Sequence, residues 1–185
     1  MKFFAIGLLV GLLILPLVGA FYVMTGRLPV AATDHTLPYE RRIAHLALNA
    51  RIRREAPDRD VSGFTAADLV AGADIYNMNC AFCHGSPQPP PSPVGRGMFP
   101  HAPQLFTPRG ALTDDPPGVI YWKVKNGIRL SGMPSFHAAL TDDQMWQVAA
   151  LLNRADQLPP EALEALRPAP VILPVQKATS ASKTK

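Results

Sequence analysis

The chain has little cysteine: Cys80 and Cys83 are the 2 among 185 residues. A tetrahedral zinc site needs a second pair of cysteine or histidine ligands, and the histidines elsewhere in the chain stand singly. A thioredoxin-like dithiol would accompany a βαβ pattern, which the sequence lacks. A structural disulfide between the two cysteines is a further alternative. The low cysteine content therefore argues against a zinc site, and the missing βαβ pattern argues against a redox dithiol.

Basic residues only slightly outnumber acidic ones in the chain. The chain has 18 basic and 14 acidic residues, a net charge of +4. Between residues 65 and 158 there are 6 basic and 7 acidic residues, so the basic excess lies outside this region. A nucleic-acid-binding domain would carry a basic stripe on a folded face. We therefore expect no nucleic-acid partner.

The two cysteines belong to the run Cys80-Ala81-Phe82-Cys83-His84. This C-x-x-C-H spacing is typical of the attachment site of a covalent c-type haem. Residues i, i+3 and i+4 share one face of a helical turn, so both sulfurs can meet the two vinyl groups of one porphyrin edge while His84 reaches the iron. The motif therefore predicts one covalently attached haem c, with Cys80, Cys83 and His84 in its binding site.

A long uncharged run lies at the N-terminus, from Phe3 to Met24, between Lys2 and Arg27. About 20 residues at about 1.5 Å each cross the hydrocarbon core of a membrane, about 30 Å thick. The alternative is a cleavable signal peptide, with Val18-Gly19-Ala20 as its processing site. We favour an uncleaved anchor because the run is longer than the apolar core of most signal peptides. Both interpretations export the rest of the chain, so we expect a single-pass inner-membrane protein facing the periplasm.

The segment from Leu37 to Ala56 has helical periodicity, and Pro57 stops it. Ile43, Leu46 and Ala50 form its predicted apolar stripe. The favoured interpretation is a spacer helix that packs this stripe on the following domain. The alternative is a helix that lies on anionic lipid.

Three further helices are predicted, over residues 65–83, 116–126 and 141–156. Thr65 with Asp68 and Thr141 with Gln144 are typical of capping boxes at helix N-termini. Glycine costs a helix interior about 1 kcal/mol, so Gly72 suggests that another helix approaches closely. Residues 85–117 hold 10 of the 20 prolines, including Pro89-Pro90-Pro91, which excludes long helices and interior strands. After a possible short helix at residues 161–166, the chain reads as a disordered or surface-hugging tail.

This order of features resembles a class I cytochrome c domain over residues 65–158. The resemblance rests on Gly72, Tyr76, the C-x-x-C-H run, Lys125-Asn126-Gly127, Ser131-Gly132-Met133-Pro134 and Trp146. It implies an all-α fold around one haem, with the first and last helices crossing near Gly72. It also implies that His84 is the proximal iron ligand and Met133 the distal one. In the family a loop proline carbonyl accepts a hydrogen bond from the proximal histidine, and Pro103 is the nearest match.

Met133 is also a good candidate on its own, because it lies between Gly132 and Pro134 in a loop where no helical stripe requires a methionine. Met78 and Met145 lie in helical patterns and are predicted to fill the core. The competing distal ligands are Met98, His101 and His137. The candidate partners of the haem propionates are Arg96, Arg109, Tyr121 and Trp122.

Two protein ligands leave no open coordination site, so we expect an electron carrier and not an enzyme. The expected role is to pass single electrons between respiratory or other redox complexes while tethered to the membrane. One alternative is a fixed haem-bearing subunit of a larger membrane oxidoreductase or terminal oxidase. A peroxidase or gas sensor would need a vacant sixth position. The predicted division is an anchor (1–26), a linker (27–64), a cytochrome c domain (65–158) and a proline-rich tail (159–185).

Overall fold

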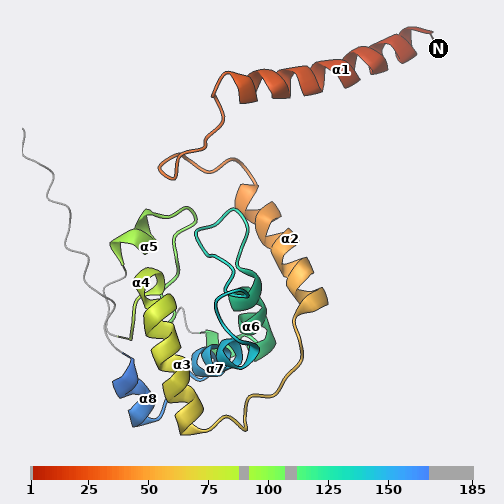
Figure 1. Cartoon of the computed structure of the whole chain (residues 1–185). Coiled ribbons are helices and arrows are strands. Elements are labelled where there is room, and N and C mark those ends of the chain that lie inside the picture. The colour runs from red at the N-terminus through yellow and green to blue at the C-terminus, as the bar shows by residue number, and fades with distance from the viewer. Residues whose placement is uncertain (1, 88–91, 107–111, 167–185) are drawn as a thin grey trace, which may run out of the picture. The chain divides into compact units, whose positions relative to one another are not determined.

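The computed structural model describes residues 2–87, 92–106 and 112–166, and within these ranges every regular element is a helix. Figure 1 labels these helices. The predicted all-α fold is confirmed. The chain divides into two compact units, Met1–Leu46 and Ala47–Lys185. The C-x-x-C-H run lies in the second unit.

Helix α1 (Lys2–Met24) belongs to the first unit and has the apolar composition that its sequence predicts. Its 23 residues are long and apolar enough to cross a membrane. A signal sequence would meet the same criteria of length and composition.

Helix α2 (Glu40–Glu55) continues into the second unit and is buried there at Ile52. Ala50, which belongs to the predicted apolar stripe, is exposed. Two residues are about 200° apart around a helix, so Ile52 and Ala50 lie on different faces. Within this unit the prediction that the helix packs through Ala50 is therefore wrong, and Ile52 is the buried residue of the helix.

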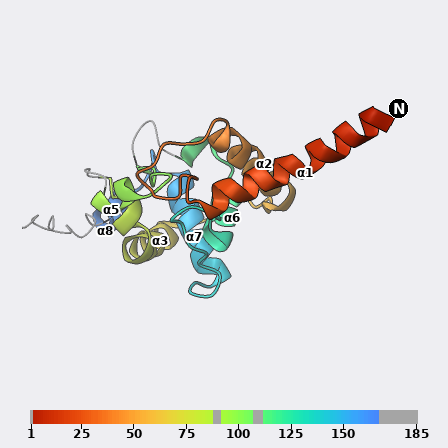
Figure 2. The same cartoon turned by 90° about the horizontal axis from the view of Figure 1, so that it is seen from above.

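Helices α3 (Ala66–Asn79) and α7 (Asp142–Asn153) form the centre of the second unit, where they pack against each other and run in different directions (Figures 1 and 2). Both predicted capping boxes are present, at Thr65 and at Thr141. A Cβ atom on Gly72 would lie 2.5 Å from the carbonyl oxygen of Gln147. The prediction that another helix approaches Gly72 is confirmed.

Helix α6 (Pro117–Asn126) packs on α7. The Tyr121 ring stacks on Trp146 of α7, with ring centroids 4.2 Å apart and planes inclined by 12°. Gly127 ends the helix, as the sequence predicts, with a φ of +66° that a residue with a side chain rarely adopts. This turn sends the following loop back along α6.

Helix α8 (Pro160–Ala165) packs on α3. Ala162 and Leu166 are buried, and the Asn77 amide donates a 2.7 Å hydrogen bond to the carbonyl oxygen of Ala165. The sequence anticipated a short helix here but placed it in a tail. Its apolar side chains instead extend the core to Leu166, and the rest of the predicted tail lies outside the described residues.

After α4 (Ala81–His84), the described residues of the proline-rich region that precede α6 (85–87, 92–106 and 112–116) contain only short elements, α5 (Pro93–Gly97) and the 3-10 turn Leu112–Asp114. This agrees with the prediction that it holds no long helix. The Ser92 hydroxyl caps α5 by accepting from the backbone amides of Val94 and Gly95. Pro89-Pro90-Pro91 and Arg109 lie outside the described residues.

Candidate haem site

The C-x-x-C-H run forms a helical turn directly after α3. The backbone amide of Cys80 donates to the carbonyl oxygen of Tyr76, and that of His84 donates to the carbonyl oxygen of Cys80 at 2.9 Å. Cys80, Cys83 and His84 are therefore one helical turn apart, as their spacing predicts. Both cysteines are free thiols and half-buried, so the alternative of a disulfide between them is not realised.

The His84 ring is held by the loop that follows α5. Its Nδ1 lies 2.8 Å from the carbonyl oxygen of Pro103. A carbonyl oxygen only accepts hydrogen bonds, so Nδ1 carries the proton and Nε2 keeps its lone pair. Burial lowers the pKa of His84, while the bond to Pro103 acts in the opposite direction. The imidazole is therefore neutral near pH 7, with Nε2 available to a metal.

The two thiols are protonated in the folded chain. Burial raises the pKa of Cys80 to about 12, with a smaller contribution from neighbouring Cys83. Burial also raises the pKa of Cys83. A reactive dithiol has a lowered thiol pKa, so the electrostatics of this pair argue against one.

Tyr76 and Gln104 support the turn from two sides. The Tyr76 hydroxyl donates a 2.8 Å hydrogen bond to the carbonyl oxygen of Gly85, and its ring meets Phe106 edge-on at 5.1 Å between centroids. The Gln104 side chain packs on Gly85 and donates to the carbonyl oxygen of Ser86 at 3.0 Å. The sequence includes Tyr76 in the family resemblance but does not predict this hydroxyl contact.

Helix α5 packs directly on the turn. A Cβ atom on Gly95 would overlap the carbonyl oxygen of Cys83, so only glycine allows this approach. The Gly95 carbonyl also accepts from the backbone amide of Ala102 at 3.0 Å. The sequence did not predict this role of Gly95, although a glycine inside a helix often has a packing reason.

Met133 lies in the loop after α6, half-buried and outside any helix. Its carbonyl oxygen accepts from the backbone amide of Ile128 at 3.1 Å, and its amide donates to the Ser131 hydroxyl at 3.2 Å. A Cβ atom on Gly127 would lie 2.6 Å from the carbonyl carbon of Pro134, so the loop closes on the end of α6.

A methionine contact brings this loop to the segment that packs on Cys83. The Met98 side chain lies against Gly132, the residue before Met133. The other competing ligands, His101 and His137, are exposed. Met98 is therefore the competitor that the structure brings to the Met133 loop.

The two helical methionines behave differently from each other. Met145 is 1% exposed and belongs to the core, as predicted. Met78 is 75% exposed, so the prediction that it fills the core is wrong. It follows buried Tyr76 by two residues and therefore lies on another face of α3.

Tyr121 and Trp122 of α6, which were expected to bind the haem propionates, donate their side-chain hydrogen bonds to other residues. The Tyr121 hydroxyl donates to Asp142 at 2.8 Å, and Trp122 Nε1 donates to Glu55 at 3.3 Å. The expectation for these two residues is therefore not supported. Arg96 is exposed.

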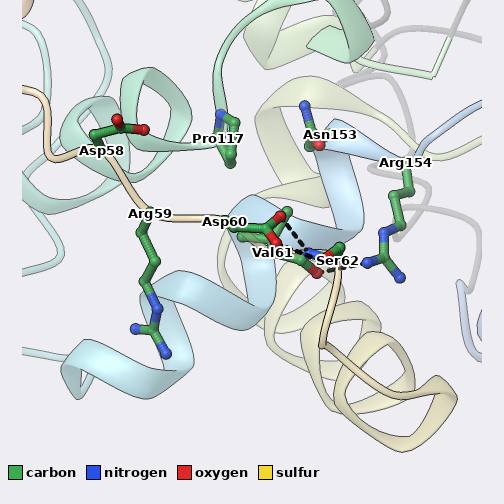
Figure 3. A pocket seen from close by; sticks show the side chains of 8 residues that line it. All are labelled: Asp58, Arg59, Asp60, Val61, Ser62, Pro117, Asn153 and Arg154. Carbon is green, nitrogen blue, oxygen red and sulfur yellow. Dashed lines mark hydrogen bonds between the residues drawn. The ribbon is translucent and has the colours of Figure 1, made fainter.

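An open depression lies between the linker and the ends of α6 and α7 (Figure 3). Arg154 crosses one side of it and donates to the carbonyl oxygens of Phe64 and Val61. None of the predicted haem residues lines this depression. The remaining lining residues are Asp58, Arg59, Asp60, Ser62, Pro117 and Asn153.

The donor set fits a covalent haem. One helical turn offers two protonated thiols and a neutral imidazole, and the loop before α7 offers a thioether. In the part of the chain that the structure describes, no three histidine, cysteine, aspartate or glutamate side chains gather to hold a metal ion on their own.

The comparisons with known proteins point to one family. A family model described as cytochrome C oxidase, cbb3-type, subunit III matches residues 67–152. Cytochrome c6 of Leptolyngbya boryana is 36% identical over 95 residues, which cover 49% of this chain and 98% of that protein. No solved structure matches. The chain therefore belongs to the class I monohaem c-type cytochromes, which carry electrons on a covalently attached haem c.

Proposed function

We propose that Cys80 and Cys83 attach the haem through thioether bonds and that His84 and Met133 ligate its iron. The observation that carries this proposal is the 2.8 Å contact between His84 Nδ1 and the Pro103 carbonyl. Such a bond fixes the tautomer and the direction of a metal-binding imidazole. The proton on Nδ1 leaves Nε2 as the ligand atom of His84.

When bound, the haem supplies an iron that alternates between the ferrous and ferric states and so carries one electron. The chain tunes that step through the two ligands. A methionine thioether favours the ferrous state and raises the reduction potential. With His84 and Met133 both holding the iron, oxygen or peroxide would have to displace Met133 in order to bind. This set of ligands favours electron transfer over catalysis.

The proposed role is a carrier that stays at the membrane and passes electrons between redox protein partners. The apolar helix Lys2–Met24 supports an anchor in the inner membrane. Covalent haem attachment fits a cytochrome domain on the exported, periplasmic side. In this proposal residues 1–26 anchor the protein, residues 27–64 link the anchor to the domain, and the domain begins at residue 65.

Spectroscopy of the holoprotein tests the ligands. An alkaline pyridine spectrum reports whether the haem is attached through two thioether bonds. The weak red charge-transfer band of ferric iron bound to sulfur should disappear in Met133→Ala, and the reduction potential should fall. Met145→Leu, a change in the core, is the matched control and should keep both. A band that survives in Met133→Ala would contradict the assignment of the distal ligand.

A second candidate is a fixed subunit of a larger oxidoreductase. It is favoured by the match of residues 67–152 to a family described as an oxidase subunit. The two roles differ in the lifetime of the complex, because electron-transfer encounters bury little surface and weaken with salt. Extraction of native membranes with a mild detergent, followed by size separation at low and high salt, distinguishes them. Comigration with other haem proteins at high salt would identify a subunit.

A further inference from the structure

Met98 occupies the space that a side chain on Gly132 would fill. A Cβ atom on Gly132 would lie 2.5 Å from the Met98 sulfur and 3.2 Å from its Cε and Cγ atoms. Three atoms of the thioether side chain therefore cover the backbone of the residue that precedes Met133. A side chain at position 132 would therefore displace the flexible end of Met98.

The segment that carries Met98 is fixed to the C-x-x-C-H turn on both sides. Before Met98, Gly95 rests on the carbonyl oxygen of Cys83. After it, the Pro103 carbonyl binds His84 Nδ1. The amide of Ala102 closes the segment by donating to the Gly95 carbonyl. Met98 thus extends from the part of the site that holds the cysteines and the histidine.

The Met133 loop is held mainly at its base. Its backbone bonds join Ile128 to Met133 and Ser131 to Ile128, and Gly127 contacts Pro134. At its tip Leu130 is 91% exposed and has a φ of +61°, a conformation unfavourable for a residue with a side chain. The contact of Met98 with Gly132 therefore joins the upper part of this loop to the cysteine side of the site.

We propose that Met98 is a positioning residue that latches the Met133 loop closed through its contact with Gly132. The proposal rests on the proposed ligation of the iron by Met133. Met98 does not bind the iron while the loop is closed. It lowers the fraction of molecules in which the loop opens and the sixth coordination position becomes accessible.

The latch predicts how readily an external ligand displaces Met133. The apparent affinity of a ligand for an open state scales with the fraction of molecules in that state. Truncation of Met98 removes packing from the closed state and leaves the iron and both proposed ligands in place. Imidazole should therefore bind ferric Met98→Ala about fivefold more tightly, in line with the cost of shortening a half-buried methionine.

The experiment is a double-mutant cycle on ferric holoprotein, with Met98→Ala, Gly132→Ala and the double variant. Imidazole is titrated while the sulfur-to-iron band is followed. Gly132→Ala should tighten imidazole binding in the same direction, because the new Cβ atom displaces the thioether. In the double variant the two effects should not add, since both remove one contact. Met78→Ala removes an exposed methionine and should leave the imidazole affinity unchanged.

Three outcomes would overturn the latch. The first is an imidazole affinity in Met98→Ala equal to that of the unmodified protein. The second is full additivity of Met98→Ala and Gly132→Ala, which would show that the two residues act separately. The third is loss of the sulfur band in Met98→Ala without imidazole, together with its survival in Met133→Ala. That last result would make Met98 the ligand and would also refute the proposed role of Met133, whereas the first two leave that role intact.

Discussion

Gly72 of α3 lies directly under the backbone of Gln147 in α7: a Cβ atom at position 72 would be 2.5 Å from the Gln147 carbonyl oxygen and 2.9 Å from its carbonyl carbon. Neither helix can relieve this clash by rotating a side chain, because the atoms that would be struck belong to the backbone. The distance between the two central helices is therefore set by the absence of a side chain at Gly72.

Gly72→Ala should lower the free energy of unfolding of the holoprotein by about 1–2 kcal/mol. Overpacking costs about 1–3 kcal/mol, and the higher helix propensity of alanine returns up to about 1 kcal/mol. Denaturant unfolding followed by far-UV circular dichroism measures the difference. Gly63→Ala is the control, because nothing lies within 4 Å of a Cβ atom at that position. Equal stability of the two variants would contradict the close crossing.

Two glycines of α5 provide a matched pair. A Cβ atom on Gly95 would overlap the Cys83 carbonyl, whereas nothing lies within 4 Å of one on Gly97. Gly95→Ala should push α5 off the C-x-x-C-H turn and lower the unfolding free energy by about 1–3 kcal/mol. Gly97→Ala should not. Both holoproteins are unfolded in the same denaturant series. If Gly97→Ala lowered the unfolding free energy as much as Gly95→Ala, the packing of α5 on Cys83 would be refuted.

The sequence predicted those parts of the fold that depend on local signals. The capping boxes at Thr65 and Thr141 and the glycine after α6 placed the helix ends within a few residues. Gly72 revealed a helix crossing because an interior glycine is costly and needs a tertiary reason. The Pro103 contact came from a different source, the resemblance to class I cytochromes c.

The parts that the sequence did not predict depend on tertiary contacts. Helix α5 has five residues, too few to show helical periodicity. The short helix α8 was anticipated, but its packing on α3 was not. The packing of Gly95 on Cys83 joins segments separated by the proline-rich region. Met78 was wrongly predicted to fill the core, because periodicity assigns a residue to a helix face but does not say which faces pack against the rest of the protein. The contact of Met98 with Gly132 joins two loops, for which no periodic pattern exists.

Tyr76→Phe tests the anchor at the end of the C-x-x-C-H turn. The variant keeps the edge-on contact with Phe106 but leaves the Gly85 carbonyl without the 2.8 Å hydrogen bond from the hydroxyl. Loss of a buried hydrogen bond costs about 1 kcal/mol, and an unsatisfied acceptor raises the cost toward about 2 kcal/mol. The unfolding free energy should fall by this amount. Tyr39→Phe, at an exposed position, is the control. Unchanged stability in Tyr76→Phe would mean that water replaces the hydroxyl.

Glu55, at the end of α2, predicts a pH dependence of stability. Hydrogen bonds from Arg51 and then Arg54 lower the pKa of Glu55 from 4.5 to about 2. A lowered pKa in the folded state gives stability that is complete above about pH 4.5 and is lost as the pH falls toward 2. Glu55→Gln should therefore have a lower urea midpoint than the unmodified protein at pH 6, and the gap should close near pH 2. Glu164→Gln, at an exposed position of α8, is the control. A gap between Glu55→Gln and the unmodified protein that stays constant with pH would show that the ion pairs of Glu55 do not stabilise the fold.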